Sequence, residues 1–220
     1  MHSAGSLIGV SDLQSYFALF HAIIFHLHFA SELRTLPTAK GQYNKWEIKM
    51  SQAATKQSSE AKLEPPRFED GKPLLIAGLR QSYTPAAMRS LPTQWQAFAP
   101  HIGKIPGQIG RTAYGVCWQA SDSSNIEYLT GVEVSTFVGM PDNFTVVSLP
   151  AANYAVFPHR EHVSKLYETC DAISRWLPES GRQSADAADA ETPAFFERYS
   201  EEFNPQTGMG GMEVWVPLKP

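Results

Sequence analysis

The residues best suited to chemistry lie near the end of the chain, which reads PAFFERYSEEFNPQTGMGGMEVWVPLKP. This order predicts two strands, Phe195 to Phe203 and Met212 to Leu218, joined by a turn rich in Gly, Asn and Pro. Side chains alternate along a strand, so one face of the first strand carries Phe195, Glu197 and Tyr199.

The same alternation puts Glu213 and Trp215 on one face of the second strand. A carboxylate among aromatic rings is what an enclosed site for a flat, lipophilic, cationic ligand needs. The rings supply apolar area and π faces, and one negative charge supplies selectivity. The alternative is a solvated strand face with a few aromatic side chains touching the core, because a motif as short as FERY recurs by chance.

Composition restricts the class of protein. The 220 residues are 43% hydrophobic and 11% aromatic, which is enough for the core of one domain and excludes a disordered chain. The net charge of -4 is unsuited to a polyanion, so we expect no direct nucleic-acid binding by this chain. Cys117 and Cys170 lack CxxC or Cys/His ligand spacing, which predicts buried, reduced thiols in the cytoplasm and no metal site. We also expect no cofactor. The GMGG turn is not a phosphate loop, because no Lys-Ser/Thr follows it and it leads into a strand.

Residues 1–49 differ from the rest of the chain. The apolar run from Tyr16 to Ala30 is shorter than the roughly 20 residues of a membrane-spanning helix, and no Lys or Arg precedes it as in a signal peptide. Its three histidines have no acidic or cysteine partner that would indicate a metal site. The sequence from Met50 onward resembles an ordinary cytosolic N-terminus, so we interpret residues 1–49 as an atypical extension, upstream sequence read in frame.

The rest of the chain divides into a polar lead-in and one folded domain. Residues 50–71 contain many polar side chains and a Pro-Pro pair, which predicts a flexible segment. The domain is predicted over residues 72–220. Apolar stripes at helical spacing predict helices at Ala86 to Ile102, with Pro92 as an awkward interior residue, and at Val163 to Leu177. Further predicted strands are PLLIAGLRQSY and residues 112–119, 128–138 and 144–157.

The order strand, helix, strand, strand therefore occurs twice. Such a repeat predicts an α+β fold of two strand-helix-strand-strand units related by a pseudo-twofold axis. We expect the units to share one antiparallel sheet, with both helices on one face and a ligand cleft between the halves.

From about Lys72 to Leu218 the sequence resembles the GyrI-like small-molecule-binding family, the effector-binding domain of AraC-type and multidrug-sensing bacterial transcription regulators. The resemblance is carried by PLLIAGLRQSY, the helix with Trp95, the hairpin TAYGVCWQ with YLTGVEV, the strand NYAVFPH, and above all PAFFERYSEEFNP with MEVWVPL. It implies two matched units with a groove between them. It also implies an acidic residue among aromatic rings that recognises lipophilic cations, and Glu197 matches that residue.

Two functions follow from the resemblance. The first is a stand-alone sensor or sequestering protein, because no basic helix-turn-helix unit precedes the domain in the first 70 residues. Such a protein would affect transcription through a partner regulator. The second is a hydrolase, since some members are similar to enzymes that open strained electrophilic compounds with paired carboxylates. Glu197 and Glu213 are the candidates for that pair, with a carboxylate as general base on water.

The predicted ligand is a lipophilic, cationic small molecule, with no membrane as partner. Glu133 in GVEV is an alternative anion on a neighbouring strand. Each aromatic residue taken alone also fits an ordinary core position. The predicted ligand-binding residues are Glu197, Tyr199, Phe195, Tyr114, Trp118, Glu133 and Trp215.

Overall fold

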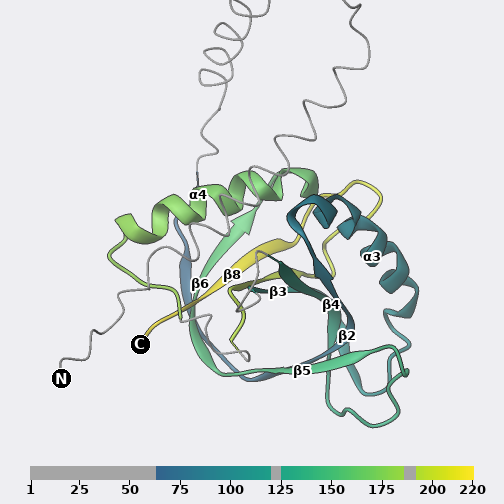
Figure 1. The fold of residues 1–220 in the computed structure, drawn as a ribbon. Helices are drawn as coiled ribbons and strands as arrows, with labels where there is room; N and C mark the ends of the chain where they lie inside the picture. The colour runs from purple at the N-terminus through teal and green to yellow at the C-terminus, as the bar shows by residue number, and fades with distance from the viewer. Residues whose placement is uncertain (1–62, 120–124, 186–191) are drawn as a thin grey trace, which may run out of the picture.

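The computed structural model describes residues 63–119, 125–185 and 192–220 (Figure 1). The predictions for residues 1–49 and for the lead-in up to residue 62 lie outside the described residues. The strands and helices are β1 (Arg67–Gly71), β2 (Leu74–Tyr83), α3 (Leu91–Phe98), β3 (Gln108–Gln119), β4 (Ile126–Val134), β5 (Thr145–Leu149), β6 (Ala152–His159), α4 (Leu166–Glu179), β7 (Phe195–Tyr199) and β8 (Met212–Leu218).

The strands of the described residues form one antiparallel sheet in the order β1-β6-β8-β7-β3-β4-β2-β5. One half of the sheet is built from β2-α3-β3-β4 and the other from β6-α4-β7-β8. The corresponding strands β3 and β7 pair with each other at the centre, so the two units are related by a pseudo-twofold axis between them. The predicted α+β fold of two strand-helix-strand-strand units is confirmed.

The strand that precedes each unit in the sequence pairs with a strand of the other unit. β1 pairs with β6 of the second unit, and β5 pairs with β2 of the first. β1 differs from the sequence-based expectation, which extended the flexible lead-in to residue 71. Its side chains are mostly exposed, so hydropathy carries no strand signal. The backbone ladder to β6, from Arg67 opposite Val156 to Gly71 opposite Ala152, holds this strand in place.

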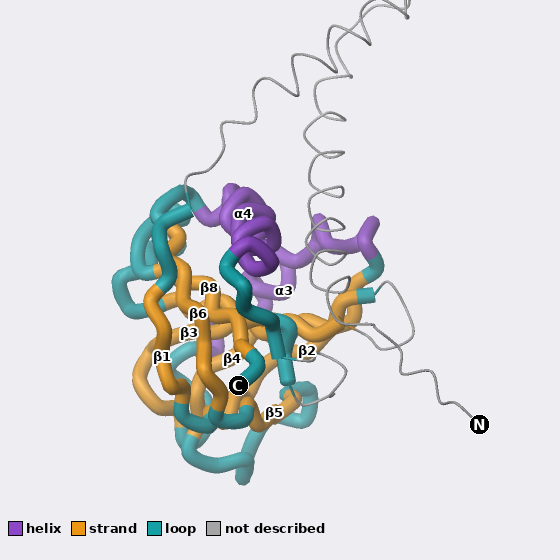
Figure 2. Tube along the Cα trace, turned by 90° about the vertical axis from the view of Figure 1, so that its left-hand side faces the viewer, coloured by secondary structure: helices purple, strands orange, loops and turns teal. Residues whose placement is uncertain are grey.

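The sheet curls, and the helices cover only one of its faces. β5 and β6 are separated by just Pro150 and Ala151, yet they belong to opposite halves of the strand order, so the sheet bends to bring these strands together. In Figure 2 α4 lies above the strands, and α3 packs against the same core cluster as α4. We call this side the helix-covered face and the other side the helix-free face. The core on the helix-free face consists of strand residues alone: Ile76, Tyr114, Val116, Trp118, Leu129, Leu149, Tyr154, Val156 and Phe196.

The helices differ from their predicted bounds for local reasons. The first predicted helix is split into a 3-10 turn Pro85–Ser90, the helix α3 and a second 3-10 turn Ala99–His101. Pro92 lies in the first turn of α3, where its missing N–H costs no hydrogen bond, and so does not kink an interior. A 3-10 turn Val163–Lys165 precedes α4, and Pro178 lies inside the last turn of α4, one residue before its end.

The first strand of the terminal hairpin is shorter than predicted. β7 ends at Tyr199, and the chain turns at Ser200, whose N–H donates to the carbonyl of Gly211. Gly211 and two nearby glycines adopt positive φ, which a glycine-rich turn accommodates. None of the helices in the described part of the chain is long and apolar enough to cross a membrane.

Candidate functional site

Glu197 is a buried carboxylate at the centre of the sheet. Its side chain lies on the helix-covered face, and the residue is 2% exposed. The hydroxyls of Tyr128 and Tyr199 both donate to its Oε2 atom, at 2.7 and 2.8 Å. No hydrogen bond from the described residues reaches the other oxygen, Oε1, and none of their basic side chains forms an ion pair with Glu197.

Strand register explains how these groups meet. Glu197 on β7 lies opposite Gly115 on β3, and Tyr128 on β4 lies opposite Cys117 of the same central strand. The Tyr128 side chain crosses over Gly115 to reach the carboxylate. A Cβ atom at Gly115 would lie 2.0 Å from Tyr128 Oη and 2.6 Å from Glu197 Oε2, so only glycine leaves room for this hydrogen bond. The site thus joins strands of both units.

Two further aromatic side chains cover the site. Trp95 on α3 donates its indole N–H to the Tyr128 hydroxyl at 3.1 Å, and its ring meets the ring of Tyr199 edge-on at 4.9 Å between centroids. Phe203, in the turn after β7, packs edge-on against Tyr199 at 4.9 Å. Trp95 and Phe203 are only partly buried. Aromatic rings therefore cover Glu197 at the place where a cleft between the halves was predicted.

Burial dominates the electrostatics of the site. It raises the pKa of Glu197 from 4.5 to about 7, although the hydrogen bonds from Tyr128 and Tyr199 oppose the shift. Burial and the neighbouring carboxylate also hold the pKa of both tyrosine hydroxyls well above 10. The hydroxyls therefore remain donors throughout the physiological pH range. Glu197 is the group that changes charge near neutral pH.

The other predicted site residues divide between the two faces. Phe195 is buried on the helix-covered face together with Tyr199. Five predicted residues belong instead to the helix-free face, because their positions in β3, β4 and β8 alternate with the buried residues of the helix-covered face: Tyr114, Trp118, Glu133, Glu213 and Trp215. The sheet itself separates them from Glu197. The predicted set therefore does not converge on one place.

On the helix-free face Glu213 is an ion-paired residue. It pairs with Arg67 at 2.7 Å and Arg198 at 3.5 Å, and it accepts the Trp215 indole N–H at 3.0 Å. Burial alone would raise its pKa, but the hydrogen bonds from Arg67 and Trp215 and the nearby positive charges bring the pKa below its ordinary value. Glu213 is thus held ionised by partners of its own.

The remaining residues on this face make local contacts. Trp118 lies under the Arg80 guanidinium, 4.8 Å from its ring centroid. Its buried indole N–H has no hydrogen-bond partner among the described residues. Glu133 interacts electrostatically with Tyr114, where it adds to the burial that raises the pKa of the phenol.

Sequence reasoning missed Tyr128 and Gly115 as site residues, and it placed Trp95 only in a helix stripe. Tyr128 is separated from Glu197 by 69 positions, and its role depends on the register of three strands. The available signal was local: a tyrosine in YLTGVEV and a glycine in TAYGVCWQ, both within predicted strands. Neither pattern states which strands are neighbours.

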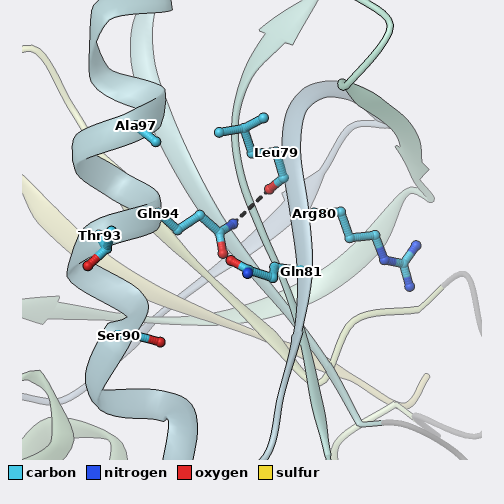
Figure 3. Close-up of a pocket in the computed structure, with 7 residues that line it drawn as sticks. All are labelled: Leu79, Arg80, Gln81, Ser90, Thr93, Gln94 and Ala97. Atoms are coloured by element: carbon cyan, nitrogen blue, oxygen red, sulfur yellow. Dashed lines mark hydrogen bonds between the residues drawn. The ribbon is translucent and has the colours of Figure 1, made fainter.

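A separate pocket of about 390 Å³ lies between α3 and β2 (Figure 3). Gln94 reaches from α3 to the strand, where its amide N–H₂ donates to the carbonyl of Leu79 at 2.7 Å and its oxygen accepts the Tyr83 hydroxyl at 2.6 Å. Figure 3 also shows Arg80 pointing away from α3. The pocket is lined by Leu79, Arg80, Gln81, Ser90, Thr93, Gln94 and Ala97.

Residues 63–119, 125–185 and 192–220 contain no cluster of side chains that could bind a metal ion. No group of three or more His, Cys, Asp or Glu side chains there is placed to hold an ion. The chemistry that the site around Glu197 supports is binding of a cation, or storage of a proton, by an enclosed carboxylate.

Comparison with known proteins gives a curated relative and several solved structures with a similar fold. One curated relative is the transcriptional regulator BrlR of Pseudomonas aeruginosa, 28% identical over 127 residues, which are 56% of this chain and 44% of the regulator. The match thus spans less than half of the regulator's length. Solved structures with the same fold include SAV2435 bound to tetraphenylphosphonium, with a TM-score of 0.58 and 17% identity over 71% of this chain and 94% of that chain.

Two other structures extend the likeness. A putative bacterial transcription regulation protein from Staphylococcus aureus MU50 has a TM-score of 0.56 and 17% identity, covering 72% of this chain and 99% of that chain. EcmrR in a DNA complex has a TM-score of 0.53 and 10% identity, covering 88% and 69%. At these identities the likeness concerns the fold. The model of one family, the GyrI-like small molecule binding domain, matches residues 64–219. Because this match includes both units and every described strand and helix, the chain belongs to the GyrI-like family of small-molecule-binding domains.

Proposed function

We propose that this domain captures lipophilic organic cations, with Glu197 as the residue that recognises their charge. The observation that carries the proposal is a carboxylate only 2% exposed, bordered by aromatic rings, with no basic partner among the described residues. An ionised carboxylate is costly in such a place unless a cation accompanies it. A bound cation supplies that partner.

The atoms around Glu197 favour a large, weakly hydrated cation. Oε2 already accepts two hydrogen bonds, which leaves Oε1 to face the ligand's charge. The rings of Trp95 and Tyr199 supply apolar area and π faces for its organic groups. A strongly hydrated inorganic cation would gain little from these rings, so selectivity for organic cations follows.

Entry of a ligand requires the aromatic cover to move, and α3 is the element that holds part of it. This helix has only eight residues, 3-10 turns on both sides, and no side-chain hydrogen bond at its N-cap. Short helices of this kind derive most of their stability from packing. Displacement of Trp95 therefore opens the site, with Glu197 fixed on the central strand β7.

The biological role that we propose is that of a sensor or sequestering protein for such compounds, linked to transcription regulation. BrlR is a transcriptional regulator, and SAV2435 binds tetraphenylphosphonium in its solved structure. Cys170 is a buried free thiol, which suits a reducing compartment, so we propose a cytoplasmic location in a bacterial cell.

The hydrolase alternative has less support. It requires paired carboxylates, and the two candidates, Glu197 and Glu213, point to opposite faces of the sheet. Glu213 is also occupied by Arg67 and Arg198. A single enclosed carboxylate suits ligand binding. A ligand that is recovered chemically unchanged would favour binding over hydrolysis.

The test compares a cation with a neutral molecule of similar shape. We expect Glu197→Gln to weaken binding of tetraphenylphosphonium by about 1 to 3 kcal/mol, because the Coulomb attraction between the carboxylate and the phosphonium charge is lost. Binding of neutral triphenylphosphine oxide should stay nearly constant. Isothermal titration calorimetry of the full chain measures both, and mass spectrometry of bound electrophilic compounds detects any gain of one water.

Glu133→Gln is the matched control, since it removes a carboxylate from the helix-free face, where Glu133 is only partly buried. It should leave the affinity for tetraphenylphosphonium unchanged. Equal losses for the cation and the neutral molecule in Glu197→Gln would mean that Glu197 serves the fold and not the ligand. A loss confined to Glu133→Gln would move the site to the other face.

A further inference from the structure

The two outermost strands of the sheet differ in charge although they occupy equivalent places. β1 lies outside β6 in one unit, and β5 lies outside β2 in the other. β1 reads RFEDG and carries three charged side chains, whereas β5 reads TVVSL and carries none. Charges on an edge strand oppose pairing with another chain, and β-branched residues favour strand pairing. One edge is therefore protected and the other is not.

The outer edge of β5 has no strand beside it among the described residues. β5 pairs only with β2, from Thr145 opposite Gly78 to Leu149 opposite Leu74. Figure 1 shows β5 at the lower border of the sheet, on the side away from α4. An edge strand presents a row of backbone N–H and C=O groups that a further strand satisfies.

The segment that leads into β5 exposes apolar side chains. Phe137 is 71% exposed and Val138 is 69% exposed, more than any other large hydrophobic residue in the described part of the chain. Both lie in the connection between β4 and β5. Neighbouring apolar side chains left in water are typical of a contact surface. This is a second observation, independent of the charge difference, in the connection that leads into β5.

We propose that two copies of this chain associate through β5, which pairs antiparallel with β5 of the second copy about a twofold axis at Val147. Thr145 of one copy then lies opposite Leu149 of the other, and no like charges meet. The same pairing of β1 about its central residue Glu69 would bring two carboxylates together, which is unfavourable. Because β5 carries no charge that would repel its own copy, and a twofold contact is self-complementary and ends after two copies, a second copy of this chain fits this edge.

Ser148 is the position at which the proposal is tested, because it is the one exposed side chain of β5. Ser148→Lys and Ser148→Glu each put two like charges beside the axis. We expect the full wild-type chain to sediment at twice its mass of 24.4 kDa. Each variant should sediment as a monomer at the same concentration, with a dimer dissociation constant raised by roughly tenfold or more. An equimolar mixture of the two variants should restore the dimer, since the charges are then opposite.

Ser82→Lys is the matched control. It makes the same substitution at an exposed serine on the neighbouring strand β2 and should leave the dimer intact. Thermal melts followed by circular dichroism establish that all four proteins fold. A wild-type chain that stays monomeric at high concentration overturns the proposal. A dimer that persists in both Ser148 variants also overturns it, because association would then use another surface.

Discussion

Glu197 exchanges the hydration of its charge for two hydrogen bonds from tyrosine hydroxyls. These bonds stabilise the ionised form, but burial penalises it more, and the pKa settles at about 7. The side chain is therefore mostly protonated in mildly acidic solution and mostly ionised in mildly basic solution. A carboxylate with this property binds a cation best above neutral pH.

The stability of the protein should depend on the protonation of this residue. Between pH 4.5 and about 7 the folded state retains a proton that the unfolded chain has released, so raising the pH favours unfolding. The contribution is fully present below pH 4.5 and lost above about pH 7. The free energy of unfolding that is lost between these two pH values through Glu197 is about 3 kcal/mol.

Glu197→Gln removes this dependence, so its stability should exceed that of the wild-type protein increasingly as the pH rises through the window. Urea unfolding of both proteins at several pH values measures the difference, in which the contributions of other titrating groups cancel. A difference that stays constant across the window would show that burial does not raise the pKa of Glu197.

Gly115 should resist substitution because of what lies above it. In Gly115→Ala the new methyl group would lie 2.0 Å from Tyr128 Oη, and we expect a loss of about 1 to 3 kcal/mol in the free energy of unfolding. The loss should be smaller in a Tyr128→Phe background, which lacks that oxygen. A double-mutant cycle by urea unfolding compares the two, and equal losses would mean that the hydroxyl is not what meets the methyl group.

Alternation along one strand predicted a shared face for Phe195, Glu197 and Tyr199, and the structure has all three on the helix-covered face. It did not reveal that Glu213 and Trp215 lie on the other face. The face that a strand presents to the helices depends on its register with its neighbours, and register is a property of the assembled sheet.

At the scale of elements, α3 is attached to the sheet by one buried polar side chain. Gln94 is 5% exposed, and its amide bridges the Leu79 carbonyl and the Tyr83 hydroxyl. Its N–H₂ group also donates to Thr130 Oγ1 at 3.3 Å. These bonds hold α3 over β2 and β4 and so keep Trp95 over the site.

Gln94→Leu should therefore lower the free energy of unfolding by about 1 to 3 kcal/mol, because it leaves buried polar groups without partners. Gln96→Leu, on the exposed side of the same helix, is the control with the same change of side chain. Chemical denaturation measures both variants. Similar losses in both would mean that the amide of Gln94 contributes nothing particular to the attachment of α3.

Helices and strands with a strong apolar pattern could be predicted from the sequence. A strand with mostly exposed side chains, held in place only by backbone hydrogen bonds, could not. The stripe of α4 and the strand β8 were found with bounds close to those of the structure. β1 was missed, since its five residues RFEDG carry no alternation of buried and exposed apolar side chains. The split of the first helix was also missed, because apolar spacing is similar in α and 3-10 turns.

At the scale of the whole molecule, the site lies where the two units meet. Glu197 comes from the second unit, whereas Tyr128 and Trp95 come from the first. The doubled order of elements predicted two such units. It did not predict that β1 and β5 each join the opposite unit, because element order does not specify strand partners.

This exchange makes β1 part of the fold and sets the point at which the chain can be shortened. A chain that begins at Leu63 should melt within a few degrees of the full chain, since the family match begins at residue 64 and β1 at Arg67. A chain that begins at Lys72 loses the ladder to β6 and should melt clearly lower. A large drop for the first truncation would show that the residues before Leu63 stabilise the domain.

The most direct test of cation recognition by Glu197 counts the protons released when a cation binds. Calorimetric titration with tetraphenylphosphonium in buffers of different ionisation enthalpy gives this number. Because the pKa of Glu197 is about 7, we expect close to one proton released at about pH 6 and close to none at about pH 8.5. Glu197→Gln should release none at either pH. Binding to the wild-type protein without proton release at about pH 6, or with the same release in Glu197→Gln, would contradict the assignment of Glu197 as the binding carboxylate.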